Sequence, residues 1–136
     1  MKTTVTLQEK MHFIGEVEGH TIDIDTSERG GGENRGMSPK QLTLTSLAGC
    51  TAMDVISILR KMRAEPESLV VEAETDVTEG YPKVFTGITL TYRVKGKNVK
   101  REQVERAVGL SHDTYCGVNA MLEKAVSIEW KIVMED

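Results

Sequence analysis

The chain has 136 residues, which is enough for one domain with a hydrophobic core and short for two. Its 17 Lys and Arg residues stand against 21 Asp and Glu residues, so the formal charge is −4. That balance excludes the basic surface that nucleic-acid backbones require. We therefore expect a single domain over residues 1–136 and no nucleic-acid partner.

The first ten residues, MKTTVTLQEK, contain neither the apolar segment nor the small-residue cleavage site of a secretory signal. The two cysteines, Cys50 and Cys116, are too few for a disulfide scaffold. In a reducing compartment such thiols are either inert or used for transient redox chemistry. We predict a cytoplasmic protein.

The opening of the chain has the pattern of a β-hairpin. Residues 3–14 and 16–25 show stretches in which polar and apolar side chains alternate, and Glu18-Gly19 is the obvious turn. Residues 26–37 then concentrate Gly, Ser and charge, which indicates a loop. This loop lacks the G-x-x-x-x-G-K pattern of a phosphate cradle, so a flexible connection is the favoured interpretation.

Residues 38–63 predict one long helix that begins with Ser38 as N-cap and Pro39 at the first helical position. No charged residue occurs from 42 to 53, and the helix is apolar nearly all round, which indicates burial on most sides. The uncharged run is shorter than the ~20 residues of a membrane span, so no membrane partner is expected. One small chain cannot easily cover such a helix, so we predict an obligate homodimer.

The second half of the chain mixes strands and helices. We expect paired antiparallel strands over 69–77 and 84–94, a helix from an Asn98 cap to Gly109, a helix over 112–125 and a last strand over 127–133. The whole predicts an α+β fold in which a mostly antiparallel sheet wraps the long helix that carries Cys50.

The two cysteines are the first candidates for chemistry. A lone cysteine in an apolar helix, such as Cys50, is more often a small core residue than a nucleophile. Cys116 falls in the first turns of its expected helix, where the helix dipole lowers a thiol pKa, and a packed or a reactive role is equally compatible with it. As a pair, one thiolate can form a sulfenic acid with a peroxide and the second thiol can condense with it to a disulfide.

A metal site is the less favoured interpretation. His112 lies four residues before Cys116, and Cys50 could add a third ligand, but no C-x-x-C motif supports such a site. His112 is better read as a helix-start residue or a polar neighbour of Cys116. A Cys-His acyl-transfer pair has no signature here. We expect neither a metal nor a cofactor.

Two motifs identify a family. The pattern S-P-x-x-L…LAGCTAMDV of the long helix, the Gly-rich loop before it and the later H-D-T-Y-C-G-V-N-A-M-L resemble the OsmC/Ohr family of osmotically inducible and organic-hydroperoxide-resistance proteins. The resemblance spans nearly the whole chain. It implies an OsmC-like fold in which two chains intertwine around two central helices, with the cysteines at the dimer interface.

The resemblance also implies roles for particular residues. Cys50 corresponds to the peroxidatic thiolate and Cys116 to the resolving thiol. Arg29 is the first candidate for the arginine that stabilises the thiolate, and Arg35 is the second. The glutamate that holds this arginine in the Ohr branch is Lys40 here, where a cation could itself favour the Cys50 thiolate. A Gly follows the second cysteine in place of the family's frequent Pro, so the chain resembles a less characterised OsmC-like branch.

The implied function is a cofactor-free reduction of organic hydroperoxides by Cys50 and Cys116. An external dithiol, in the Ohr branch a lipoylated protein, would reopen the disulfide. Leu47 and Met53, together with residues of the partner chain, are expected to line an apolar pocket that prefers bulky organic peroxides to hydrogen peroxide. The alternative is a non-enzymatic dimer of the same fold that binds an apolar small molecule or a partner at its interface.

Overall fold

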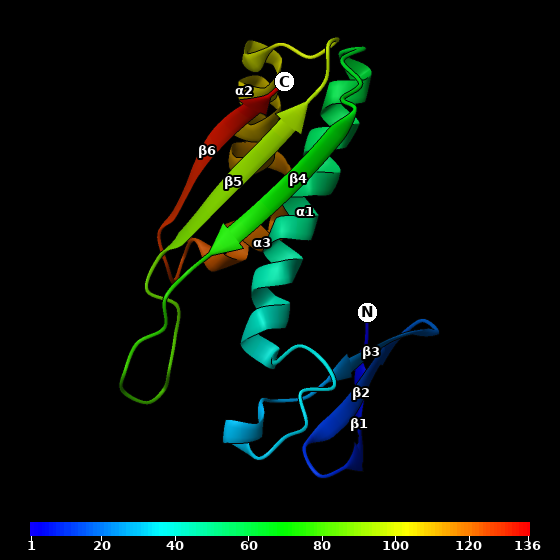
Figure 1. Ribbon diagram of the computed structural model, residues 1–136, viewed down its shortest axis with the longest axis vertical. Coiled ribbons are helices and arrows are strands. Elements are labelled where there is room, and N and C mark those ends of the chain that lie inside the picture. Colours follow the sequence, from blue (N-terminus) through cyan, green and yellow to red (C-terminus); the bar gives the residue numbers. More distant parts are fainter. The chain divides into compact units, whose positions relative to one another are not determined.

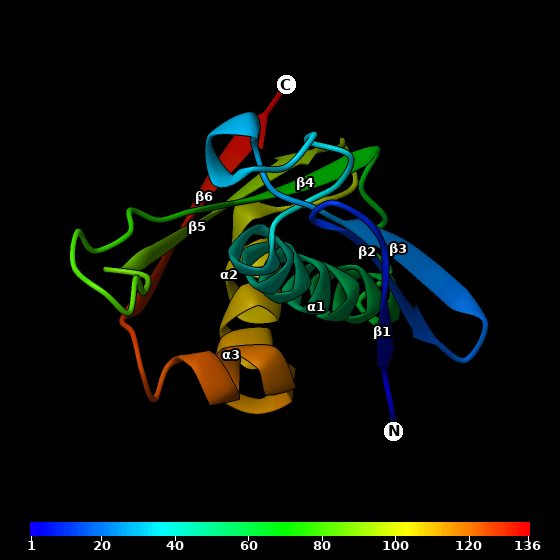
Figure 2. The same cartoon turned by 90° about the horizontal axis from the view of Figure 1, so that it is seen from below.

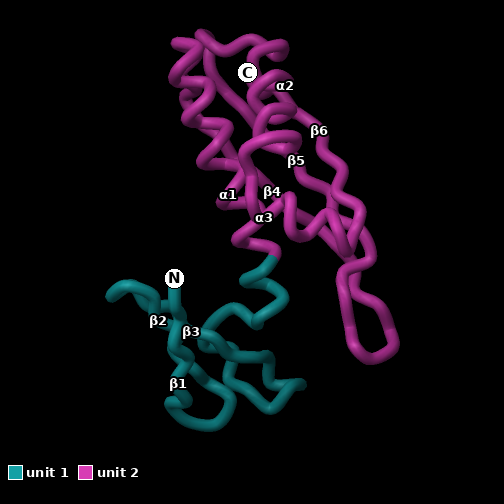
Figure 3. The backbone as a smooth tube through the Cα atoms, turned by 180° about the vertical axis from the view of Figure 1, so that it is seen from behind, with its two compact units in different colours: residues 1–43 teal, residues 44–136 magenta.

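The computed structural model describes residues 1–136 and divides into two compact units, residues 1–43 and residues 44–136 (Figure 3). The boundary falls near the start of the long helix α1 (Pro39–Lys61), so most of that helix belongs to the second unit. The expectation of one domain stays a prediction.

The first unit is a three-stranded antiparallel sheet in the order β1 (Thr4–Glu9), β2 (His12–Val17) and β3 (His20–Ile24). The turn at Glu18 and Gly19 is confirmed. The strand expected over residues 3–14 is wrong, because the chain reverses at Lys10, which has a left-handed φ of 50°. The N-terminal segment therefore forms a three-stranded sheet instead of the predicted two-stranded hairpin.

The Gly-rich loop after β3 is folded around the carboxylate of Asp25. That carboxylate accepts hydrogen bonds from the backbone N–H groups of Thr26 at 2.7 Å, Arg35 at 3.1 Å and Glu33 at 3.3 Å. A Cβ on Gly32 would lie 2.4 Å from an Asp25 oxygen, so only glycine fits there. The loop, which includes the short 3₁₀ helix η1 (Glu28–Gly30), is thus a bonded structure and not merely a flexible connection.

The start of α1 is confirmed by its cap. Ser38 Oγ accepts a hydrogen bond from the N–H of Gln41 at 3.4 Å, and Gln41 Oε1 accepts one from the N–H of Ser38 at 2.9 Å. This reciprocal pair is a capping box, and Pro39 follows it as the first helical residue.

Within one chain, α1 buries a single stripe. The buried residues recur every four positions: Leu47, Thr51, Val55 and Leu59. Its other sides are half-buried or exposed, so the expectation of burial on most sides is wrong for the single chain. By length and composition alone α1 could also cross a membrane, although the core helix of a soluble protein passes the same test.

The second unit contains a three-stranded sheet in the order β4 (Ser68–Glu74), β5 (Ile88–Lys95) and β6 (Ile128–Glu135) (Figure 1). β4 and β5 pair antiparallel, as predicted, with Ser68 opposite Lys95. β5 and β6 pair parallel, with Ile88 opposite Ile128. The other strand pairings of the chain are antiparallel, which confirms an α+β fold with mostly antiparallel sheets.

The crossover from β5 to β6 consists of α2 (Arg101–Leu110), the π-helical turn η2 (Ser111–Tyr115) and α3 (Gly117–Leu122). The predicted cap at Asn98 is wrong by two residues: the side chain of Gln103 accepts a hydrogen bond from the N–H of Lys100. Gly109 does not end α2, because the helix runs on into η2. The helix expected over 112–125 is interrupted at Cys116.

This crossover places α2 and α3 on the same side of the sheet as α1 (Figure 2). Parallel neighbours cannot be joined by a tight turn, so the connecting segment must cross a face of the sheet. The core forms between that face and the helices, and its fully buried members include Leu47, Leu59, Leu90, Tyr92, Val94, Val104 and Val108. Residues far apart in sequence meet here, and the candidate site lies among them.

Candidate functional site

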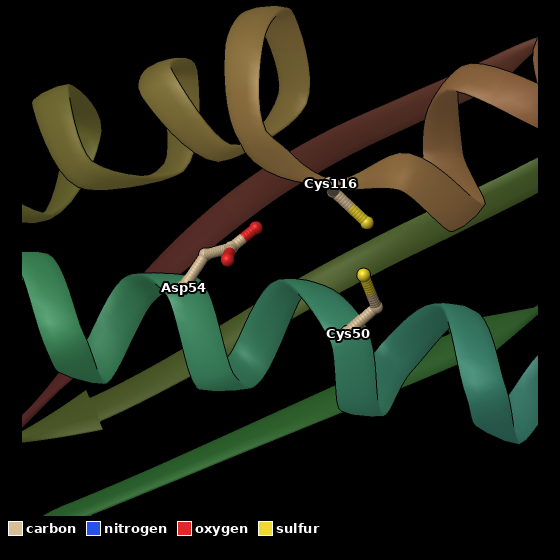
Figure 4. A group of neighbouring side chains, drawn as sticks. All are labelled: Cys50, Asp54 and Cys116. Atoms are coloured by element: carbon tan, nitrogen blue, oxygen red, sulfur yellow. The ribbon is translucent and has the colours of Figure 1, made fainter.

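The two cysteines of one chain face each other in the second unit. Cys50 extends from α1, and Cys116 extends from the junction of η2 and α3 toward it (Figure 4). Both thiols are free, and their Sγ atoms lie within 4.8 Å of each other. Cys50 is half-buried, whereas Cys116 is only 3% exposed.

Cys116 is the N-cap of α3 and not a residue of its first turn. Its Sγ accepts a hydrogen bond from the N–H of Asn119 at 3.3 Å. Burial raises the pKa of the Cys116 thiol to about 12, helped by its hydrogen bond with Cys50 and the negative field of Asp54, and the Asn119 N–H opposes this only in part. The expected lowering of this pKa is therefore wrong, because desolvation outweighs the helix start.

A third group joins the two thiols. One carboxylate oxygen of Asp54 lies within 4.8 Å of both sulfur atoms. Asp54 follows Cys50 by four residues, which puts both side chains on one face of α1 (Figure 4). Asp54 was not among the predicted site residues, although its i,i+4 spacing from a candidate nucleophile was a usable signal.

A chain of buried hydroxyls fixes the Asp54 carboxylate. Ser111 Oγ donates a hydrogen bond to Asp54 Oδ2 at 2.9 Å, and Thr51 Oγ1 lies 2.8 Å from Ser111 Oγ and 2.6 Å from the Tyr92 hydroxyl. A carboxylate only accepts, so Thr51 donates to Ser111 and Tyr92 donates to Thr51. Burial raises the pKa of Tyr92 to about 12, which keeps this last donor protonated.

The π-helical turn is what brings Ser111 into this chain. The N–H of Cys116 bonds to the carbonyl of Ser111 at 2.8 Å, an i to i+5 contact. Ser111 is fully buried at the start of the turn, and Cys116 ends it. One local feature thus positions both the donor to Asp54 and the second thiol.

The candidate cations lie elsewhere in the chain. Arg29, Arg35 and Lys40 all belong to the first unit, whereas the thiols belong to the second. Arg35 forms ion pairs with Glu9 at 3.2 Å and Glu33 at 3.7 Å. Arg29 is exposed and forms no ion pair. Their roles toward the thiolate stay predictions.

The remaining candidate residues have different environments. His112 lies in η2, and its backbone carbonyl accepts a hydrogen bond from the Asn119 side chain. Its imidazole does not belong to the cluster of Cys50, Asp54 and Cys116. Leu47 is sealed in the core, and Met53 is 73% exposed. The expected pocket also includes residues of a partner chain, so it stays a prediction.

A hollow of about 260 Å³ opens beside the cluster of Cys50, Asp54 and Cys116. It is lined by Asp54, Ser57, Ile58, Lys61, Leu110 and Tyr115. The Ile, Leu and Tyr side chains make part of its wall apolar, and Asp54 connects it to the two thiols. Neither cysteine lines the hollow, so Asp54 is the residue that the hollow shares with the candidate site.

Solved structures share this fold over nearly the whole chain. A crystal structure of a protein of Aquifex aeolicus VF5, 28% identical, covers 99% of this chain and 97% of that chain with a TM-score of 0.84. The structure of the organic hydroperoxide resistance protein OhrB of Bacillus subtilis, 18% identical, covers 97% of this chain and 96% of that chain with a TM-score of 0.69. The fold class is therefore that of the OsmC and Ohr proteins.

Sequence comparison leads to the same family. Residues 30–131 match the OsmC-like protein family. Protein YhfA of Escherichia coli K12 is 39% identical over 129 residues, which are 94% of this chain and 93% of YhfA. The chain belongs to the OsmC family, as the two cysteine motifs indicate.

Proposed function

We propose that this protein is a thiol-dependent peroxidase that reduces organic hydroperoxides with Cys50 and Cys116. The observation that carries the proposal is the approach of the two sulfur atoms to within 4.8 Å. A disulfide needs a sulfur separation of about 2.05 Å, so a small side-chain movement joins them. Membership of the OsmC family and the shared fold with hydroperoxide resistance proteins support the same chemistry.

The cycle has three balanced steps. The Cys50 thiolate attacks one peroxide oxygen and breaks the O–O bond, which leaves a sulfenic acid on Cys50 and an alkoxide that takes a proton to become an alcohol. The Cys116 sulfur then attacks the Cys50 sulfur and expels water, so that both cysteines are oxidised to a disulfide. An external dithiol reduces this disulfide and becomes a disulfide itself.

The exposure of the two thiols supports the proposed order of their reactions. Cys50 is half-buried and lies closer to solvent, whereas Cys116 is 3% exposed and receives the N–H of Asn119. A peroxide arriving from solvent meets Cys50 first. Cys116 is shielded from direct oxidation and is placed to resolve the sulfenic acid.

A nearby cation would favour the Cys50 thiolate. Arg29 is our first candidate because it is not engaged in an ion pair, whereas Arg35 is held by Glu9 and Glu33. Lys40, in the first turn of α1, is the remaining candidate.

The preferred substrate is an organic hydroperoxide with an apolar substituent. The hollow beside Asp54 offers Ile58, Leu110 and Tyr115 to such a group. The external reductant is a dithiol, of which a lipoylated protein is one example, and a reducing cytoplasm is the compartment in which this cycle can run.

The active form is a homodimer. Within one chain, Met53 on α1 and Met121 on α3 are 73% and 66% exposed. The first unit has exposed apolar side chains on its sheet, among them Leu7 and Ile22, and a three-stranded sheet needs a packed face to be stable. A second copy that covers these surfaces accounts for them.

The test is the intact mass and free-thiol count after one equivalent of cumene hydroperoxide or hydrogen peroxide. We expect the loss of two thiols and two hydrogens, faster with the organic peroxide. Cys116→Ser should stop at a sulfenic acid that dimedone traps on Cys50. If both thiols survive treatment with each of the two peroxides, the proposed peroxidase activity is refuted and the non-enzymatic binding protein is favoured.

A further inference from the structure

The two thiols and the Asp54 carboxylate also form a set of metal-binding groups. One ligand atom from each of Cys50, Asp54 and Cys116 lies within 4.8 Å of the other two (Figure 4). Ligand atoms bound to one tetrahedral zinc ion lie about 3.3–3.8 Å apart, given bond lengths of about 2.0–2.3 Å. The three groups therefore need only a slight contraction to share one ion.

Each ligand is held by rigid structure. Cys50 and Asp54 lie four residues apart on α1, so their side chains share one helix face. Cys116 is fixed as the N-cap between η2 and α3. Three ligands from two packed segments give a site that exists before any ion arrives, and only tertiary structure could assemble it.

Hydrogen bonds of the kind that surround metal ligands are present as well. Ser111 Oγ donates to Asp54 Oδ2, and the carboxylate keeps further lone pairs for a metal ion. The N–H of Asn119 donates to the sulfur of Cys116. Donors of this sort orient metal ligands and hold their negative charge.

The charges of the three ligands suit a cation. A metal ion binds cysteine as the thiolate and releases the thiol proton, and its positive charge then offsets the two thiolates and the carboxylate at this spacing. No Lys or Arg of the second unit forms an ion pair with Asp54. Thiolate sulfur selects soft or borderline ions such as Zn²⁺ over Mg²⁺ and Ca²⁺.

We infer that the reduced protein binds a zinc-class divalent cation through Cys50 Sγ, Cys116 Sγ and one oxygen of Asp54. Three protein ligands leave a fourth tetrahedral position for a water molecule. His112 is not a ligand, in contrast to the set that its spacing from Cys116 first suggested.

Metal binding and peroxide reduction would use the same sulfur atoms. The two metal-bound thiolates, one hydroperoxide and two protons would give the disulfide, an alcohol, water and the free metal ion. The cation thus protects the reduced pair, and oxidation releases it. This consequence rests on the proposed peroxidase function, whereas the metal site itself does not.

The experiment is an anaerobic titration of reduced, metal-free protein with Co²⁺. We expect one Co²⁺ ion to bind per chain and to give the thiolate-to-cobalt charge-transfer band of a tetrahedral site. One equivalent of Zn²⁺ should displace the Co²⁺ and abolish this band. As a readout without mutation, Zn²⁺ should slow alkylation of Cys50 by iodoacetamide.

Variants identify the ligands. Asp54→Asn still accepts the Ser111 hydrogen bond but loses the anionic oxygen, so we expect at least about tenfold weaker Co²⁺ binding. Cys50→Ser should lose about half of the charge-transfer intensity per bound ion, because one of the two thiolate ligands remains. Asp113→Asn makes the same chemical change on an exposed residue of η2, and His112→Ala removes the rival ligand, so both should bind like the original protein.

Absence of a charge-transfer band, or unchanged alkylation of Cys50 with Zn²⁺, would overturn the proposal. So would an Asp54→Asn protein that binds Co²⁺ as tightly as Asp113→Asn, or a loss of binding in His112→Ala. The result is independent of the peroxidase assay, because Co²⁺ binding without peroxide reduction refutes only the proposed function, and the reverse result refutes only the metal site.

Discussion

Asp25 in the first unit and Asp54 in the second are two carboxylates with opposite surroundings. Asp25 accepts hydrogen bonds from three backbone N–H groups, which occupy its oxygens and tie down the loop around it. Asp54 accepts a hydrogen bond from the single hydroxyl of Ser111 and faces two thiols. A carboxylate whose hydrogen bonds hold the backbone is structural, whereas one that accepts a single hydroxyl and lies beside two thiols has lone pairs available for chemistry.

The largest expected effect is on peroxide reduction, and it comes from replacing Cys50, which lies beside Asp54. Cys50→Ser should lower peroxide reduction at least about a thousandfold, because the hydroxyl is a far weaker nucleophile than a thiolate. Its free energy of unfolding should change by only about 1 kcal/mol. Peroxide consumption assays beside denaturant unfolding measure both, with Asp113→Asn as the control. An active Cys50→Ser protein contradicts the mechanism.

Removal of the Asp25 carboxylate should affect the structure of the first unit. Asp25→Ala leaves three backbone N–H groups without their acceptor, so the loop around Asp25 should open and β3 should lose protection. Amide hydrogen exchange over residues 20–36 measures this, and the exposed Glu18→Gln serves as control. Unchanged exchange would show that the carboxylate does not hold the loop.

The same carboxylate predicts a pH dependence. Burial opposes ionisation of Asp25, but the N–H groups of Thr26, Arg35 and Glu33 together with the charge of His12 outweigh it and lower the pKa of Asp25. A lowered folded-state pKa means that the unfolded chain binds more protons in acid. This contribution is therefore complete above the usual Asp pKa of about 3.9 and is lost as the pH falls through the folded-state value.

Unfolding of the original protein and of Asp25→Asn should be compared from pH 7 to pH 2. The two stabilities should differ most at neutral pH and converge in acid below about pH 4. A difference that grows as the pH falls has the wrong sign and would contradict the role given to Asp25.

The smallest effect concerns the far end of the hydroxyl chain. Tyr92→Phe removes one buried hydrogen bond to Thr51, which keeps its bond to Ser111, so the loss of stability should be about 1 kcal/mol. Denaturant unfolding followed by the fluorescence of Trp130 measures it. A loss well above this value would show that Tyr92 supports Asp54 through the whole chain.

Local patterns predicted much of the fold because their causes are local. The cap at Ser38, the turn at Glu18-Gly19 and the antiparallel pairing of β4 with β5 all follow from residues close together in the chain. The errors lie where several local signals compete. Lys10 turns a chain that alternates like a strand, and α2 runs past Gly109 into a π-helical turn.

The sequence by itself determined the family, the α+β class and the two cysteines as candidates, since short motifs carry that information. Only the tertiary structure decided that Cys50, Asp54 and Cys116 meet, that Cys116 caps α3 and that its pKa is raised. The physical reason is the parallel crossover from β5 to β6, which carries Cys116 across the sheet to α1. Contacts made by such a crossover depend on packing between distant segments and leave no local signal.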